Sequence, residues 1–281
     1  MSTSITYTTS LEIRRETVEE LARLLAAHRQ VLGTRKGTRA LGPFKQAVLV
    51  IRWFLDATRL RQLWADNGIS KSTAYAYLQE GIEVLAARAP DLQTVLEQAE
   101  QAGLTHLNLD GTVIRTDRVH TPGPGGADLW WSGKHKHHGG NVQVVSMPDG
   151  WPLWVSDVRP GREHDTTCAK AAEELLPLLE AAERGGIPTL TDLGYKNLSP
   201  ALRTPIKKPK GRELDEDAKA YNALIRGIHA PSERANSLLK TTFKAMRRVS
   251  LDPWRIGAIT KAALVLLHLE HDHSPSTATQ R

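Results

Sequence analysis

Residues 104–112, LTHLNLDGT, alternate between apolar and polar side chains as a β-strand does. On such a strand Leu107 and Leu109 point to one face and Asp110 points to the other. The pattern predicts that Asp110 stands at the end of a strand, on the face opposite the leucines. A two-residue hairpin turn at Asp110 and Gly111 is the alternative interpretation of the same residues.

Two later segments each place an acid where it can join Asp110. The segment IPTLTDLGY puts Asp192 at the end of a second predicted strand, and PSERANSLLKTTFKAM puts Glu233 in the first turn of a helix. Each acid also has an ordinary structural explanation, because Asp192 suits a capping position and Glu233 suits the positive end of a helix dipole. Together, the three carboxylates predict a cage for a divalent metal ion.

Apolar residues at helical spacing predict a helical N-terminal part, with helices at 16–32, 43–57, 58–68 and 70–88. Between the last two, Gly68 suits a tight turn and Ser70 suits an N-cap, which is typical of a helix-turn-helix. The side chains expected to reach DNA from its recognition helix are Lys71, Ser72, Thr73 and Tyr75. An ordinary helical subdomain is the alternative.

After Gly103 the pattern changes to short alternating segments separated by turns, with a helix at about 166–183. This order of strands and helix predicts a mixed α/β sheet. The predicted domain organisation is an N-terminal helix with a basic connector (1–40), a helix-turn-helix domain (41–102), an α/β domain (103–271) and a disordered tail (272–281).

Composition adds charge and compartment to this picture. The 281 residues include 37 Lys and Arg against 31 Asp and Glu, for a net charge of +6, which mildly favours a polyanionic partner. The single cysteine, Cys168, excludes an internal disulfide and a cysteine-rich zinc module. No secretion signal and no apolar run of about 18 residues is present, so the expected compartment is the cytoplasm.

Two basic clusters are candidates for contact with phosphate. The sequence KHKHH at 134–138 predicts a basic loop or hairpin rather than a zinc site, since neighbouring strand residues point to opposite faces. The second cluster lies on the predicted Glu233 helix, whose polar face is expected to be exposed and basic. The side chains expected to contact phosphate are Lys134, His135, Lys136, Lys240 and Lys244.

Several motifs from about residue 40 to 270 resemble the DDE-superfamily transposases of bacterial insertion sequences, in the harbinger-like endonuclease branch. They are DGT (110–112), SGKHKHHGGN (132–141), PGREHD (160–165), DLGY (192–195) and SER with the following LLK (232–240). The resemblance implies a ribonuclease H-like catalytic domain, with Asp110, Asp192 and Glu233 as its DDE triad, after a helix-turn-helix that binds the element's end. The chain departs from the family at His229, where relatives often carry an arginine.

The triad suggests metal-dependent phosphoryl transfer. In such a mechanism two Mg²⁺ ions about 3.5–4 Å apart, with Mn²⁺ as a substitute, activate water or a DNA 3′-hydroxyl and stabilise the leaving oxygen. Carboxylates suit these hard cations better than the nearby histidines do. Asp165 is a weaker candidate for a supporting role.

The predicted function is a DNA transposase and endonuclease that cleaves the ends of an insertion sequence and transfers the cut strand. Its expected partner is double-stranded DNA, bound by a homodimer or a larger synaptic assembly in a bacterial nucleoid. Two alternatives stay open, because a fold does not by itself establish an activity. One is a domesticated, catalytically silent DNA-binding regulator, and the other is a nuclease that acts outside transposition.

Overall fold

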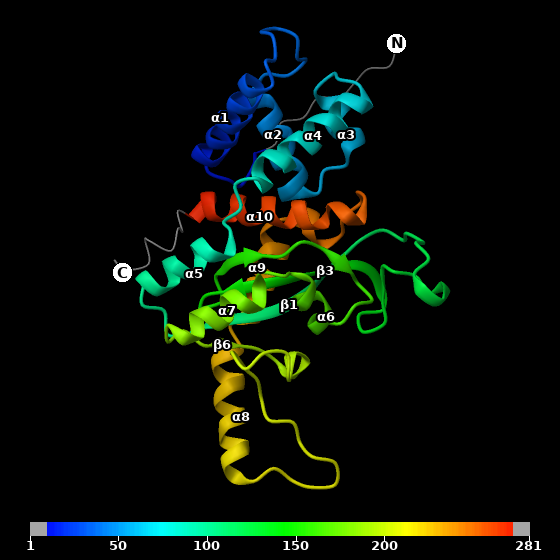
Figure 1. Cartoon of the computed structure of the whole chain (residues 1–281). Helices are drawn as coiled ribbons and strands as arrows, with labels where there is room; N and C mark the ends of the chain where they lie inside the picture. Colours follow the sequence, from blue (N-terminus) through cyan, green and yellow to red (C-terminus); the bar gives the residue numbers. More distant parts are fainter. Residues whose placement is uncertain (1–9, 272–281) are drawn as a thin grey trace. The chain divides into compact units, whose positions relative to one another are not determined.

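A computed structural model describes residues 10–271, and the chain divides after Val84 into two compact units. The first unit is helical (Figure 1). Its helices are α1 (Arg15–Val31), α2 (Pro43–Asp56), α3 (Leu60–Asp66) and α4 (Lys71–Ala86), the last of which leads into the second unit. The predicted disordered tail lies outside the described residues.

The helices of the first unit follow the predicted apolar pattern. The buried stripe of α1 consists of Val18, Leu21, Leu24 and Leu25, and α1 packs against α2. The turn between α3 and α4 has the predicted chemistry, because Gly68 has φ +60°, a conformation that glycine adopts without strain. The hydroxyl of Ser70 accepts a hydrogen bond of 3.1 Å from the Thr73 amide, which caps α4.

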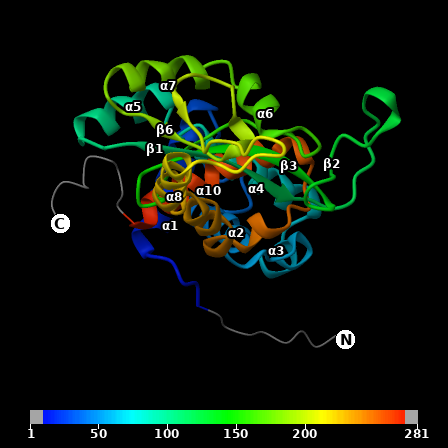
Figure 2. The same ribbon diagram turned by 90° about the horizontal axis from the view of Figure 1, so that it is seen from below.

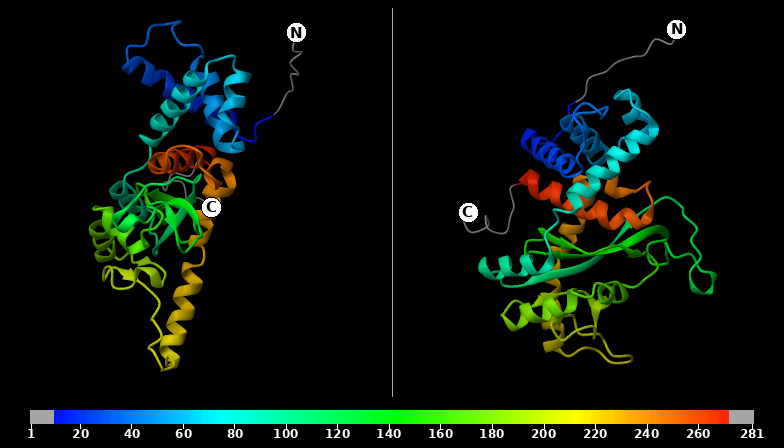
Figure 3. Two further views of the ribbon diagram at one scale, coloured as in Figure 1. Left: turned by 90° about the vertical axis from the view of Figure 1, so that its right-hand side faces the viewer. Right: turned by 45° about the horizontal axis from the view of Figure 1, so that its top comes forward.

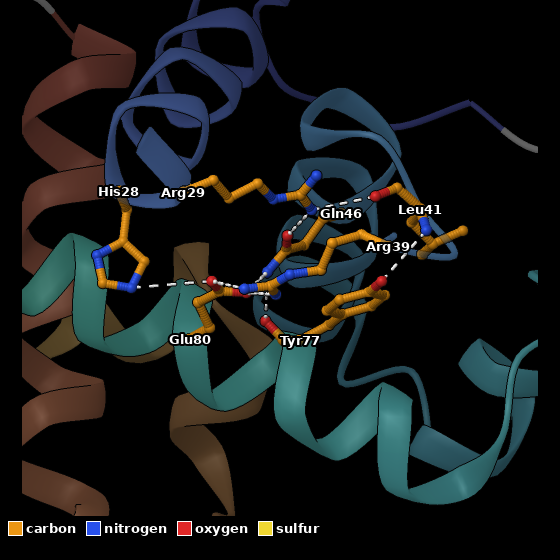
Figure 4. A network of polar contacts seen from close by, with 7 residues as sticks. All are labelled: His28, Arg29, Arg39, Leu41, Gln46, Tyr77 and Glu80. Carbon is orange, nitrogen blue, oxygen red and sulfur yellow. Dashed lines mark hydrogen bonds and ion pairs between the residues drawn. The ribbon is translucent and has the colours of Figure 1, made fainter. Parts of the chain in front are cut away.

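A part-buried polar cluster joins α1, α2 and α4 to the connector between α1 and α2 (Figure 4). Its centre is the Glu80 carboxylate on α4, whose side chain is 11% exposed. Arg39 donates two hydrogen bonds to it, of 2.7 and 3.0 Å, and the Gln46 amide donates a third of 2.8 Å. Arg29 on α1 donates to the Gln46 oxygen. One carboxylate therefore links all these elements.

The cluster lowers the pKa of Glu80. Burial by itself raises the pKa of Glu80, but the hydrogen bonds from Arg39 and Gln46, and the positive charges of Arg39 and Arg29, outweigh that effect and lower it. The pKa therefore lies below its ordinary value of 4.5. A carboxylate in this setting serves as a structural anchor.

Glu80→Gln is expected to destabilise the first unit by about 1–3 kcal/mol, because it leaves Arg39 without its carboxylate. Since folding lowers the pKa of Glu80, the stabilisation is complete above pH 4.5 and is lost as the pH falls below that value. Amide hydrogen exchange of α2 and α4 in the full chain at pH 7 measures the change. The matched control is Glu12→Gln, at an exposed position of the same unit. Equal exchange in both variants contradicts the role given to the cluster.

The second unit is a mixed sheet packed between helices. Its strands are β1 (Leu107–Arg115), β2 (Trp131–Ser132), β3 (His137–Ser146), β4 (Pro152–Val155), β5 (Arg159–Pro160), β6 (Thr189–Leu190) and β7 (Leu202–Arg203). Its helices are α5 (Leu92–Gln101), α6 (Asp165–Ala171), α7 (Leu175–Arg184), α8 (Glu216–His229), α9 (Ser232–Thr242) and α10 (Ile256–His271). Short 3₁₀ turns are η1 (Pro124–Gly126), η2 (Leu193–Tyr195), η3 (Lys244–Arg247) and η4 (Pro253–Arg255).

The sheet confirms the predicted mixed α/β class. β1 and β3 form a long antiparallel pair, from Asn108 opposite Ser146 to Arg115 opposite Gly139. β6 is parallel to β1 on its other edge, and β7 is parallel to β6. Helices α5, α6 and α7 cover one face of the sheet, and α9 and α10 cover the other (Figures 1 and 2). α8 and the loop before it project from the sheet (Figure 3).

Three boundaries differ from the prediction. The predicted helix-turn-helix domain (41–102) includes α5. In the structure α5 belongs to the second unit, because its buried apolar face packs on α7 and β4. The range 1–40 was separated from the helices after it, but α1 packs on α2 within one unit. The predicted helix at 166–183 is broken between α6 and α7.

No helix within residues 10–271 is long and apolar enough to cross a membrane.

Candidate active site

Asp110 lies within β1, as the fourth of its nine residues, and neither at its end nor in a hairpin turn. The prediction of a strand was correct, but its end was placed too early. The strand continues through Gly111 because the ladder with β3 continues, with Asp110 opposite Val144 and Gly111 opposite Gln143. Asp110 is therefore held by regular backbone pairing on β1.

Polar side chains of helix α9 make hydrogen bonds to the face of β1 that carries Asp110. The Asn236 amide donates a hydrogen bond of 2.8 Å to one Asp110 oxygen, and the Gly111 amide donates one of 2.9 Å to the other. One turn further along α9, the Lys240 ammonium donates to the Thr112 hydroxyl at 2.7 Å. Asn236 and Lys240 follow Glu233 by three and seven residues, which places all three on one helix face.

This arrangement corrects the expected exposed basic face of the Glu233 helix. Lys240 is part-buried against β1, and burial lowers its pKa while the charge of Asp110 acts in the opposite direction. Lys244 is exposed, but it lies in η3 beyond the end of α9. Asn236 was missed, although its position three residues after Glu233 and four before Lys240 was the available signal.

The three predicted acids line one cavity of about 620 Å³. Asp110 comes from β1, Glu233 from the first turn of α9, and Asp192 from two residues beyond β6. Asp192 also caps η2, since its carboxylate accepts a hydrogen bond of 2.8 Å from the Gly194 amide. Side chains that form the rest of the wall include Leu193, Ile206, Lys208, Leu214, Asn222, Ile225, Arg226 and His229.

Burial, reinforced by the other acids, disfavours the ionised form of Asp110. Burial raises the pKa of Asp110 to about 6, with the negative charges of Asp192 and Asp165 adding to the effect. The Gly111 amide and the charge of Lys134 act in the opposite direction without cancelling it. A carboxyl group whose pKa is raised by burial and like charge, in a cavity, is a typical feature of a functional site.

The three acids do not lie close enough together to form a complete metal site. Among residues 10–271, no three His, Cys, Asp or Glu side chains form a group that could hold a metal ion by themselves. The predicted cage is thus present only as three carboxylates on a shared cavity wall.

His229, at the position where relatives often carry arginine, is nearly buried on the cavity wall. Its Nδ1 lies 2.9 Å from the Ser232 hydroxyl, and its Nε2 has no hydrogen-bond partner within the described part of the chain. Burial lowers the pKa of His229, against the charge of Asp192. At neutral pH this position therefore carries an uncharged ring in place of a guanidinium.

The predicted phosphate contacts lie in separate places. Lys134, His135 and Lys136 form the exposed turn between β2 and β3, which confirms the predicted hairpin. Lys134 lies 3.9 Å from the Asp165 carboxylate. In the first unit, the side chains at the start of α4 are exposed or half-buried: Lys71, Ser72, Thr73 and Tyr75.

Asp110→Asn is expected to stabilise the metal-free protein at neutral pH. Raising the pKa from 3.8 to about 6 disfavours the ionised carboxylate by about 3 kcal/mol. The folded protein holds the proton more tightly, so wild-type stability falls as the pH rises from 3.8 to about 6. The Asn236 amide, which donates to Asp110 in the wild type, can rotate so that its oxygen accepts from the new amide, because that oxygen has no hydrogen-bond partner in the described chain.

Thermal unfolding in EDTA at pH 5 and pH 7.5 tests this expectation. The gain in Tm of Asp110→Asn over the wild type should be larger at pH 7.5. An equal or smaller gain at pH 7.5 contradicts the free-energy cost inferred for ionising Asp110.

Comparison with known proteins gives one family match and two weaker similarities. A model of the DDE superfamily endonucleases matches residues 109–268. The probable transposase for insertion sequence element IS702 of Microchaete diplosiphon is 23% identical over 202 residues, which cover 69% of this chain and 68% of that protein. The structure of the Mos1 transposase paired-end complex with left transposon end shares 12% identity, over 96% of this chain and 82% of that one. Its TM-score of 0.21 is too low to show a shared fold.

Proposed function

Because the chain belongs to the DDE superfamily endonucleases, we propose that it is a transposase that cuts DNA at the ends of an insertion sequence and transfers the cut strand. The proposed catalytic acids are Asp110, Asp192 and Glu233. The observation that carries the proposal is that these acids, from three separate elements, line one cavity. A ribonuclease H-like arrangement, implied by the resemblance, is part of the proposal and is supported by the mixed sheet.

The proposed cofactor is Mg²⁺, bound as two ions by the three acids, with Mn²⁺ as a substitute. The donors fit, because carboxylate oxygens are the ligands that such cations prefer and because a cation would offset the burial and the like charges that raise the pKa of Asp110. An open set of acids is compatible with Mg²⁺, which completes its coordination with water and substrate phosphate. When bound, such ions would supply Lewis acidity toward phosphate and lower the pKa of bound water.

The residues around the acids hold them in place. Asn236 and the Gly111 amide each bind one oxygen of Asp110, which fixes the orientation of its carboxylate. Lys240 holds α9 against β1 through its hydrogen bond to Thr112. This contact also holds Glu233, on the same helix, at its position relative to the strand. A carboxylate that is oriented before the substrate arrives needs less reorganisation during the reaction.

Double-stranded DNA is the proposed partner. The exposed start of α4 is proposed as a recognition helix, supported by its Gly68 turn and Ser70 cap. The exposed turn at Lys134, His135 and Lys136 and the exposed Lys244 are proposed to contact the phosphate backbone near the acids. Holding two DNA ends calls for a dimer or larger assembly, and the proposed location is the bacterial nucleoid.

A catalytically silent DNA-binding regulator is the competing proposal. The observation that favours it is the absence, among the described residues, of a closed group of metal ligands. It predicts binding of the same DNA without cleavage in any metal.

Glu233→Gln is expected to reduce Mg²⁺-dependent cleavage of a labelled duplex carrying the element's ends by at least about 100-fold, since it removes one carboxylate ligand. DNA binding should change less than about twofold, because the residue lies outside the proposed recognition helix. Glu97→Gln, on the exposed side of α5, is the matched control. Binding without cleavage by the wild type in Mg²⁺ or Mn²⁺ would favour the regulator.

Lys71→Ala tests the recognition helix. Loss of one phosphate contact should weaken binding and reduce the slope of log K against log salt concentration by about 0.9. Lys45→Ala, which removes another exposed lysine from the same unit, should leave both quantities unchanged. If Lys71→Ala and Lys45→Ala have the same DNA affinity and the same salt dependence, Lys71 does not contact DNA.

A further inference from the structure

A chain of hydrogen bonds runs along β3 on the face of the sheet opposite Asp110. The Tyr195 hydroxyl donates to the Gln143 oxygen at 2.6 Å, and the Gln143 amide donates to the Asn141 oxygen at 3.0 Å. The Asn141 amide then donates to the Asp165 carboxylate at 2.7 Å. Gln143 and Asn141 alternate along β3, which places both on the side of Gly111 rather than of Asp110.

Both ends of this chain touch segments that carry acids. Tyr195 stands three residues after Asp192, in the turn η2 that Asp192 caps. At the other end, the Asp165 carboxylate fills the space that a side chain on residue 111 would need. A Cβ on Gly111 would lie 2.3 Å from the Asp165 Oδ1 atom. The chain therefore joins the Asp192 segment to the residue beside Asp110.

The direction of the chain is fixed. Tyr195 and Gln143 are fully buried and Asn141 is 3% exposed, so no solvent replaces a lost partner. Each amide accepts from one neighbour and donates to the next, so rotating either amide would break two hydrogen bonds. Burial also raises the pKa of Tyr195 well above 10, which keeps its hydroxyl as a donor. Asp165 is thus required as the final acceptor.

We propose that Asp165, through Asn141, Gln143 and Tyr195, is a positioning residue that holds Asp110 and Asp192 at the separation needed to bind a divalent cation together. The inference rests on the proposed function and extends it beyond the three acids. Nothing in it requires Asp165 to touch the cation. Its ion pair with Lys134 is long and the lysine side chain is 72% exposed, so that contact contributes little.

Mn²⁺ binding by the whole protein without DNA tests the proposal, measured by loss of the free-ion electron paramagnetic resonance signal. Asp165→Ala and Tyr195→Phe each break the chain at one end and should weaken Mn²⁺ binding by about 10-fold or more, as loss of groups that orient metal ligands does. Asp165→Asn keeps an oxygen that accepts from Asn141, so its affinity should stay within about threefold of wild type.

Tyr221→Phe, which removes a hydroxyl from α8, is the matched control and should bind Mn²⁺ as the wild type does. Thermal unfolding of each variant is measured in parallel. A purely structural role would lower the Tm of Tyr195→Phe and leave the Mn²⁺ affinity of the folded protein unchanged, which overturns the proposal. Asp165→Asn binding as weakly as Asp165→Ala also overturns it, since that result assigns the effect to charge.

Mn²⁺ binding and DNA cleavage by the wild-type protein distinguish failure of the positioning role from failure of the proposed function. A wild type that binds no Mn²⁺ overturns both proposals. A wild type that binds Mn²⁺ and cuts DNA, beside Tyr195→Phe and Asp165→Ala proteins of equal affinity, overturns the positioning role alone.

Discussion

The burial of one carboxylate, Asp110, beside other acids is the constraint on which the site depends. Burial in the sheet, with the negative charges of Asp192 and Asp165 adding to it, raises the pKa of Asp110 to about 6, and Glu233 lines the same cavity. Negative charges gathered in a low-dielectric setting cost free energy unless a cation or hydrogen-bond donors offset them. The surrounding elements supply the donors, and an incoming cation would supply the rest.

The two units shift the pKa of a buried carboxylate in opposite directions. In the first unit, Arg39 and Gln46 surround Glu80, so its pKa falls and the group serves as an anchor. In the second unit no arginine binds Asp110 among the hydrogen bonds of the described residues, and its pKa rises. The difference separates a structural acid from the acid proposed to be catalytic, because a carboxylate without a cationic partner gains more from a metal ion than a paired one does.

Strand β1 serves the site from both of its faces. On one face, α9 contributes Asn236 and Lys240 to hold Asp110 and the strand. On the other, Gly111 leaves room for the Asp165 carboxylate and for the hydrogen-bond chain that leads back to Tyr195. The glycine after the first acid therefore marks a point where two layers of the fold meet. A side chain there would displace one of them.

The sequence by itself determined the local features of this protein, because they depend on periodicity and turn chemistry. It predicted the mixed sheet, the helix that begins beside Glu233, the Gly68 turn and the hairpin at Lys134. Only the tertiary structure decided where β1 ends, since its ladder with β3 carries the strand past Asp110. It alone turned Lys240 inward and linked Tyr195 to Asp165, because these contacts join residues far apart in the chain, whose pairing no local pattern encodes.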